Sequence, residues 1–214
     1  MQTEDVKRRY IIPMVFGVLI INVLVSGCTQ LAEYENRSKI HSTEYVEKNS
    51  EAGSSGRNYT SYTNNEFNFS IDYPGDWNVV PMKSKITFIS PNRYEGGHIT
   101  LTLQLLSSRD SGGTYNSVDD VISDLLVQYR EHNENVSNVS VIYEREEMLS
   151  GSKGKELNIS YNLYGMNYTQ TQIVARGGKF FYVIMYIAQS EHYNEYADVY
   201  EYSKRHFRLI NNYS

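Results

Sequence analysis

The chain lacks most of the signatures from which a reaction is inferred. It contains no Gly-x-Ser-x-Gly, no Walker phosphate-binding loop and no Gly-x-Gly-x-x-Gly. It is mildly acidic, with a formal net charge of -5, and no basic run follows the first residues. Nucleic-acid binding leaves a clustered basic footprint, so we expect no nucleic-acid partner.

Cysteine occurs once, at Cys28, so no disulfide framework can form within the chain. This residue closes the run Leu24-Val25-Ser26-Gly27-Cys28, which has the form of a lipobox. A basic segment at residues 7–9 and an apolar stretch at 11–25 precede it, as in an export signal. We therefore expect residues 1–27 to be a signal peptide, removed before Cys28, whose thiol then carries a lipid.

The apolar stretch leaves one alternative for the N-terminus. A membrane-spanning helix needs roughly 20 apolar residues. The stretch at 11–25 is shorter than this, and Pro13 and Asn22 interrupt it. The alternative is an uncleaved signal anchor. Both interpretations place the rest of the chain at the outer face of the cytoplasmic membrane.

Composition indicates one folded domain behind a tether. Residues 28–62 are predicted to be the lipidated cysteine and a flexible linker, because 49–62 are rich in Ser, Gly and Asn. Residues 63–214 are long enough for a single domain with a full core. The chain has 20 tyrosines, which suit sheet packing; a sugar-stacking surface is the alternative.

Hydrophobic periodicity predicts an α+β domain with two helices and consecutive antiparallel strands. In Pro74-Gly75, proline at the second position and glycine with positive φ at the third would form a type II turn, and Trp77 would re-enter the core. Asn68 and Asn158 would lie inside strands. The helices are expected from Ser117 to about 133 and from about 190 to 206. The strands are expected at 67–73, 86–89, 99–106, 139–149, 157–163, 168–176 and 180–187, with a hairpin turn at 150–154 and the 180–187 strand at the centre.

Asn-x-Ser/Thr sequons are dense, and each could accept a glycan in an exported protein. Strand positions make Asn68 and Asn158 the poorer candidates. The better candidate N-glycosylation sites are Asn36, Asn58, Asn135, Asn138, Asn167 and Asn212.

The order of elements resembles the PsbP-like family over residues 64 to 210. The residues that carry the resemblance are an alternating aromatic strand ending in Tyr73-Pro74-Gly75-Asp76-Trp77, a Gly-x-x-Gly-x-x-Leu hairpin at 151–157, and a terminal helix ending in His206-Phe207. The resemblance implies an α/β/α sandwich around a mainly antiparallel sheet. It also implies a binding or accessory role, because similar domains occur on prokaryotic lipoproteins, including archaeal ones, without an assigned activity. It implies no cofactor.

Three further chemistries have weak support in the sequence. Ser150 to Lys153 matches Ser-x-x-Lys, but its predicted place is a hairpin turn without partner motifs. His192 and Glu195, with Glu191 or Asp198, form a conceivable cation site, and Asp119, Asp120 and Asp124 a conceivable calcium site. Charged side chains on a solvated helix surface, and at the start of a helix, are the preferred explanation for both groups. We expect no catalysis and no metal.

The sequence thus predicts a lipid-anchored surface protein whose domain binds an unknown envelope protein. A ligand- or glycan-binding lipoprotein with a tyrosine-lined cleft is the second hypothesis, and a hydrolase with paired carboxylates is the third.

The lipid anchor can be tested with Cys28→Ser. Without a thiol there is no atom to alkylate, so we expect an unprocessed precursor that takes up no labelled lipid. Metabolic lipid labelling and the mass of the mature N-terminus measure this. A variant cut and anchored like the wild type would rule out the lipobox.

Overall fold

The computed structural model describes residues 56–210. The chain divides into two units, 1–42 and 43–214, and the described residues all belong to the second. The predicted signal peptide, Cys28, Asn36 and Asn212 lie outside the described residues.

Seven strands form one antiparallel sheet in the order β3-β4-β5-β9-β8-β7-β6, and a smaller sheet has the order β1-β2-β10. The central strand of the large sheet is β9, as its apolar sequence predicts. The strands are β1 (Tyr59–Asn64), β2 (Phe69–Pro74), β3 (Asn78–Met82), β4 (Lys85–Tyr94), β5 (Gly97–Ser107), β6 (Val136–Leu149), β7 (Ser152–Leu163), β8 (Met166–Gly177), β9 (Phe180–Gln189) and β10 (Arg208–Leu209).

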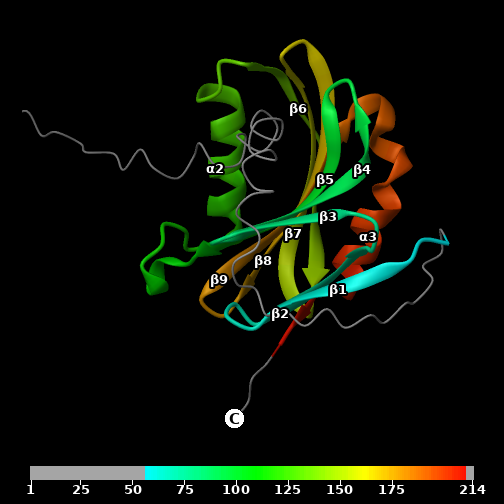
Figure 1. The fold of residues 1–214 in the computed structure, drawn as a ribbon. Helices are drawn as coiled ribbons and strands as arrows, with labels where there is room; N and C mark the ends of the chain where they lie inside the picture. Colours follow the sequence, from blue (N-terminus) through cyan, green and yellow to red (C-terminus); the bar gives the residue numbers. More distant parts are fainter. Residues whose placement is uncertain (1–55, 211–214) are drawn as a thin grey trace, which may run out of the picture. The chain divides into compact units, whose positions relative to one another are not determined.

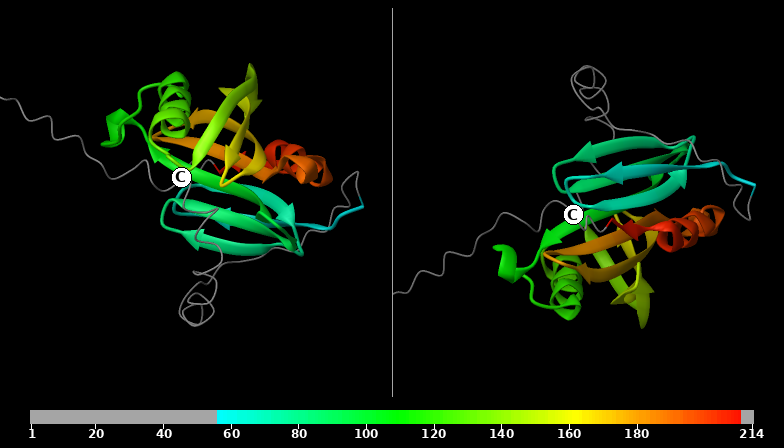
Figure 2. Two further views of the ribbon diagram at one scale, coloured as in Figure 1. Left: turned by 90° about the horizontal axis from the view of Figure 1, so that it is seen from above. Right: turned by 90° about the horizontal axis from the view of Figure 1, so that it is seen from below.

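Two α-helices lie on opposite sides of the large sheet (Figures 1 and 2). They are α2 (Val118–Glu131) and α3 (Ala197–His206); short 3-10 helices are η2 (Arg109–Ser111) and η3 (Ser190–Glu195). Side chains of a strand alternate between faces. Accordingly β7 presents Tyr161 to α2, where the ring centroids of Tyr129 and Tyr161 are 4.9 Å apart, and Glu156 to α3. The α/β/α arrangement is confirmed.

The main core lies between the large sheet and the layer made by α3 and the small sheet. From β5 it receives Ile99, Leu101, Leu103 and Leu105, the alternating set that the sequence predicts. Rings from the small sheet close it: Tyr73 stacks on Phe88 with centroids 4.4 Å apart. Tyrosines fill this core and the layer under α2, and those buried are Tyr59, Tyr62, Tyr73, Tyr129, Tyr161, Tyr168, Tyr182, Tyr186, Tyr196, Tyr200 and Tyr202.

Helix α2 begins as predicted. The Ser117 hydroxyl accepts a hydrogen bond from the Asp120 N–H at 3.1 Å, and the Asp120 carboxylate accepts one from the Ser117 N–H at 3.2 Å. This capping box satisfies two backbone donors that the helix itself cannot pair. Backbone hydrogen bonds from Asn116 and Ser117 keep the pKa of Asp120 below its usual value.

The domain begins earlier than residue 63, so the predicted end of the tether at residue 62 is wrong. Strand β1 starts at Tyr59 and pairs with β2 in a register that sets Tyr62 opposite Ile71. Tyr59 also stacks on Tyr202 of α3 at 3.7 Å between centroids. Strand β1 is hard to recognise in the sequence because it is rich in Ser, Thr and Asn. Only every third side chain is buried, so the alternation typical of a strand is missing.

The strand predicted at 67–73 begins two residues later, at Phe69. Asn68 lies in the β1–β2 turn with φ of 54°, so its predicted place inside a strand is wrong. Asn158 does lie within β7 and is buried.

The predicted type II turn at Pro74-Gly75 is also wrong. Proline ends β2 at the first turn position, the Trp77 N–H donates to its carbonyl at 3.0 Å, and Gly75 does not have a positive φ. Trp77 is buried against Tyr196, with centroids 5.5 Å apart, as its predicted return to the core requires.

Two further boundaries differ from the prediction. The β6–β7 turn is only Ser150-Gly151, both at positive φ, and Gly154 lies inside β7. A Cβ on Gly154 would lie 2.3 Å from the Val174 carbonyl oxygen, so close strand contact explains this glycine. The predicted helix 190–206 is broken at Tyr196 into η3 and α3.

Loss of the cap should weaken α2. Ser117→Ala leaves the Asp120 N–H without its acceptor, and we expect a loss of about 1 kcal/mol in the free energy of unfolding. Urea denaturation measures it. Ser123→Ala, exposed in the middle of α2, is the matched control and should change stability by far less. Equal losses in both variants would contradict the capping role.

Candidate functional site

A buried carboxylate joins three elements on the α3 side of the sheet. Glu156 of β7 is fully buried, although glutamate is rarely so unless paired. Its Oε1 atom accepts hydrogen bonds from the Tyr143 hydroxyl at 3.0 Å and from Arg145 Nη2 at 2.5 Å, both on β6. Its Oε2 atom accepts from the Tyr200 hydroxyl at 2.9 Å and from Lys204 Nζ at 2.6 Å, both on α3. We call these five residues the Glu156 cluster.

Local structure places the four donors around Glu156. Arg145 lies directly opposite Glu156 in the β6–β7 register. Tyr200 and Lys204 are four residues apart on α3, so they share one face of the helix. Neither spacing is informative alone, because sequence does not show which strand face α3 covers. This cluster therefore cannot be recognised in the sequence alone.

The cluster is charged at neutral pH. Burial acts to raise the pKa of Glu156, but hydrogen bonds and charge from Lys204, with the two tyrosine hydroxyls, hold it below its usual value. Burial acts to lower the pKa of Lys204, and its carboxylate partners Glu156 and Glu201 raise it above the usual value. Both oxygens of Glu156 already accept two bonds each, so the carboxylate acts as a clamp between α3 and the sheet, with no free site for a substrate proton.

A second polar contact continues from this cluster to η3. The Asn158 amide donates to the Thr171 hydroxyl at 2.5 Å and to the Tyr193 hydroxyl at 3.3 Å. The Tyr186 hydroxyl donates to the Tyr193 carbonyl at 2.7 Å. These bonds fix η3 on strands β7, β8 and β9.

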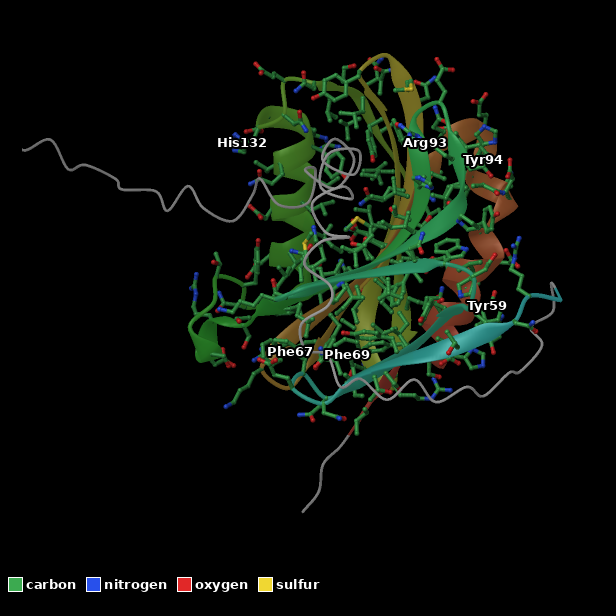
Figure 3. The ribbon with its side chains drawn as sticks, in the orientation of Figure 1. Tyr59, Phe67, Phe69, Arg93, Tyr94 and His132 are labelled. Atoms are coloured by element: carbon green, nitrogen blue, oxygen red, sulfur yellow. The ribbon has the colours of Figure 1, made fainter. Side chains whose placement is uncertain are left out.

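η3 forms a cluster at the surface with the tip of β4, which we call the η3 cluster: the half-buried Tyr94 and His192 and the exposed Glu195. The rings of Tyr94 and His192 lie 4.0 Å apart between centroids. The Glu195 carboxylate accepts from the Tyr94 hydroxyl at 2.5 Å and contacts His192 Nδ1 at 2.6 Å. Figure 3 shows Tyr94 beside the orange helical segment.

Hydrogen bonding sets the ionisation of this cluster. Burial and the bond to Glu195 raise the pKa of Tyr94 to about 12. Bonds from Tyr94 and His192 lower the pKa of Glu195. His192 Nε2 lies 3.4 Å from the Glu191 carboxylate, so both ring nitrogens face acids. The arrangement suits a fixed aromatic and charged contact surface better than proton transfer to a substrate.

The conceivable cation sites are not assembled. Within residues 56–210, no group of three or more His, Cys, Asp or Glu side chains could hold a metal ion. Asp120 caps α2, Asp124 accepts from the Tyr115 hydroxyl, and Asp119 pairs with Lys155. Helix-surface roles explain these acids.

Ser150 of the Ser-x-x-Lys match has a structural role. Its hydroxyl accepts a hydrogen bond from the Leu209 N–H at 3.0 Å, which ties β10 to the β6–β7 turn. Lys153 is exposed on β7.

None of the helices described for residues 56–210 is long and apolar enough to cross a membrane.

The fold is similar to solved structures. PsbP from the cyanobacterium Synechocystis sp. PCC 6803 matches with a TM-score of 0.53 at 11% identity, over 74% of this chain and 97% of that protein. LpqN of Mycobacterium tuberculosis, a protein involved in cell envelope biogenesis, matches with a TM-score of 0.50 at 14% identity, over 85% of this chain and 97% of that protein. No protein-family model and no curated protein matches the chain. The domain therefore has an α+β, PsbP-like fold, and at this identity the likeness is one of fold.

We expect the buried charge of Glu156 to contribute strongly to the free energy of unfolding. Glu156→Gln leaves Lys204 and Arg145 facing a neutral amide, and we expect a loss of about 3 kcal/mol in the free energy of unfolding at pH 7. Because folding lowers the Glu156 pKa, its contribution is full above the usual value of 4.5 and is lost as the pH falls through the folded value. The gap between wild type and variant should therefore shrink in acid.

Denaturant unfolding at several pH values measures this gap. Glu146→Gln, which changes an exposed glutamate next to Arg145 on β6, is the matched control and should cost little. A gap that stays constant down to pH 3 would show that the Glu156 charge does not stabilise the fold.

Proposed function

We propose that the protein is a lipid-anchored accessory protein whose PsbP-like domain binds another protein of the cell envelope at the η3 cluster, without catalysis. The observation that carries the proposal is the half-buried stack of Tyr94 and His192 at the surface, fixed by the exposed Glu195.

Rigidity of the η3 cluster supports binding. Arg57, just before β1, donates to the Glu195 carbonyl at 3.0 Å, and its guanidinium lies 4.4 Å from the centroid of the Tyr196 ring. Asn92 of β4 donates to the Tyr196 hydroxyl at 3.0 Å. Three chain segments thus hold one surface in place, which lowers the entropy lost on binding. Tyrosine and arginine side chains, such as Tyr94 and neighbouring Arg93, carry much of the energy of protein interfaces.

The state of the titratable groups supports a role without catalysis. A general acid or base needs a free proton-transfer atom within reach of the substrate. The Glu156 carboxylate is saturated with donors, and both nitrogens of His192 face carboxylates. The other shifted acids, Asp110 and Asp120, are paired at the surface or cap a helix.

The lipobox and the sequence that follows it support the proposed location. An acylated glyceryl group on Cys28 provides the two chains that stable membrane anchoring needs. The 30 residues between Cys28 and Tyr59 would reach on the order of 100 Å if fully extended, enough to present the domain to a neighbouring envelope protein.

A ligand-binding lipoprotein is the second candidate, favoured by polar side chains on the α2 side of the sheet. Thr100 and Gln172 are buried there, and within residues 56–210 neither the Thr100 hydroxyl nor the Gln172 amide nitrogen has a hydrogen-bond partner. Such atoms commonly bond to water or a ligand. The buried tyrosines, however, pack in the core. Saccharides that raise the melting temperature would favour this candidate.

The partner surface can be tested by crosslinking in native membranes. We expect wild type to capture a defined envelope protein, and Tyr94→Ala to reduce the yield at least tenfold because the ring stack is lost. Tyr164→Ala removes an exposed tyrosine of the β7–β8 turn that is not a member of this cluster, and it should capture normally. Mass spectrometry quantifies the product. Equal capture by all three proteins would exclude the η3 cluster as the interface.

A further inference from the structure

One corner of the large sheet carries an uncharged polar surface. Except for Asn138, which lies in a β-bulge of β6, its members form cross-strand rows on β6, β7 and β8, on the same side of the sheet as α3. We call it the Ser/Thr/Asn patch: Ser137, Asn138, Ser140, Ser160, Asn162, Asn167 and Thr169. Ser137, Asn162 and Asn167 form one row, and the Asn162 amide donates to Asn167 Oδ1 at 3.1 Å. All seven side chains are exposed or half-buried.

The patch contains Asn-x-Ser/Thr glycan-acceptor sequences that lie on β-strands. Residues i and i+2 of a strand face the same way, so the asparagine and hydroxyl of Asn-x-Ser/Thr lie side by side. Asn167 and Thr169 meet this condition on β8. Asn138 lies two residues before Ser140 on β6, but the register shift between Ser137 and Ser140 interrupts the alternation of faces across this sequon. Asn158 and Ser160 have the same spacing on β7, but Asn158 is buried and its amide nitrogen bonds to Thr171 and Tyr193.

The two exposed asparagines differ from Asn158 at the acceptor atom. Asn138 is exposed at a β-bulge with φ of 54°, where the β6–β7 register shifts. Asn167 uses Oδ1 in its bond with Asn162, and its Nδ2 atom takes no part in that bond. The fold therefore separates sequons that look alike in the sequence.

The position of the patch gives a glycan a physical role. Strand β6 is an edge of the large sheet, and exposed edges pair with other chains unless something prevents it. Residues 144–147 protect one half of β6 with four charges. Residues 136–143 have none, and Ile142 there is 57% exposed. A glycan on Asn138 would cover this half.

We infer that Asn138 and Asn167 carry N-linked glycans that cover the Ser/Thr/Asn patch, whereas Asn158 stays unmodified. The donor is a lipid-phosphate-linked oligosaccharide used by a sequon-specific transferase. A bond forms between Asn Nδ2 and the anomeric carbon, the bond from that carbon to the donor phosphate oxygen breaks, and Nδ2 loses one proton. The inference does not depend on the proposed partner, although the patch reaches the start of η3, where the Thr169 and Ser190 hydroxyl oxygens lie 2.9 Å apart.

The test uses full-length protein purified from the membranes of its native host, with glycopeptide mass spectrometry. We expect glycan at Asn138 and Asn167. Ser140→Ala should lose only the glycan on Asn138, and Thr169→Ala only that on Asn167, because each removes one sequon hydroxyl. Ser160→Ala is the matched control and should leave the glycan mass unchanged.

Asn138→Gln and Asn167→Gln guard against loss through misfolding, because they keep the hydroxyls and remove only the acceptor nitrogen. Each should lose the same single glycan as its serine or threonine counterpart while the unfolding temperature confirms a folded domain. Unmodified peptides covering Asn138 and Asn167 in the wild type, or a glycan on Asn158, would overturn the inference.

Discussion

The contact between α3 and the large sheet depends on one fully buried charge, that of Glu156. A lone carboxylate in this position would be strongly unfavourable, and only the combined donors of β6 and α3 make it tolerable. The requirement is mutual, because Lys204 is itself almost wholly buried and needs the carboxylate. The pair therefore does more than add attraction: it specifies the angle and register at which α3 lies on β7, since a shift by one helical residue would separate the charges.

The rest of the α3 layer follows from this placement. Once α3 is held, Tyr202 stacks on Tyr59 and aligns β1, and Phe207 enters the core against Phe69 at 6.1 Å between centroids. The segment before α3 also lies against the sheet, where Tyr193 of η3 forms hydrogen bonds with β7 and β8. The η3 cluster is thus the exposed end of a layer whose buried end is Glu156. A partner that binds Tyr94 and His192 would contact a preorganised surface, because the chain beneath it is fixed from three sides.

Much of the fold could be predicted from the sequence, because strand and helix periodicities are local. The alternation in β5, the capping box at Ser117 and the apolar run of β9 each specify their element without knowledge of a neighbour. Strand β1 was missed because its burial depends on the second sheet and on Tyr202, both distant in the chain. The break at Tyr196 was missed for the same reason, since Tyr196 turns inward to Trp77 of the β2–β3 turn and Asn92 of β4, both distant in the chain.

By itself the sequence determined the class of the domain, the polar and apolar faces of its strands, and the sequons, all of which follow from residue types at short spacing. Only the tertiary structure decided which polar face is covered. Along β7, Glu156, Asn158, Ser160 and Asn162 follow one another at alternate positions and look equivalent. The helical layer buries the first two, which become a clamp and a structural amide, and leaves the last two in the uncharged patch. Burial by a distant element, and not residue type, separates structural polar groups from those that a partner or a glycan can reach.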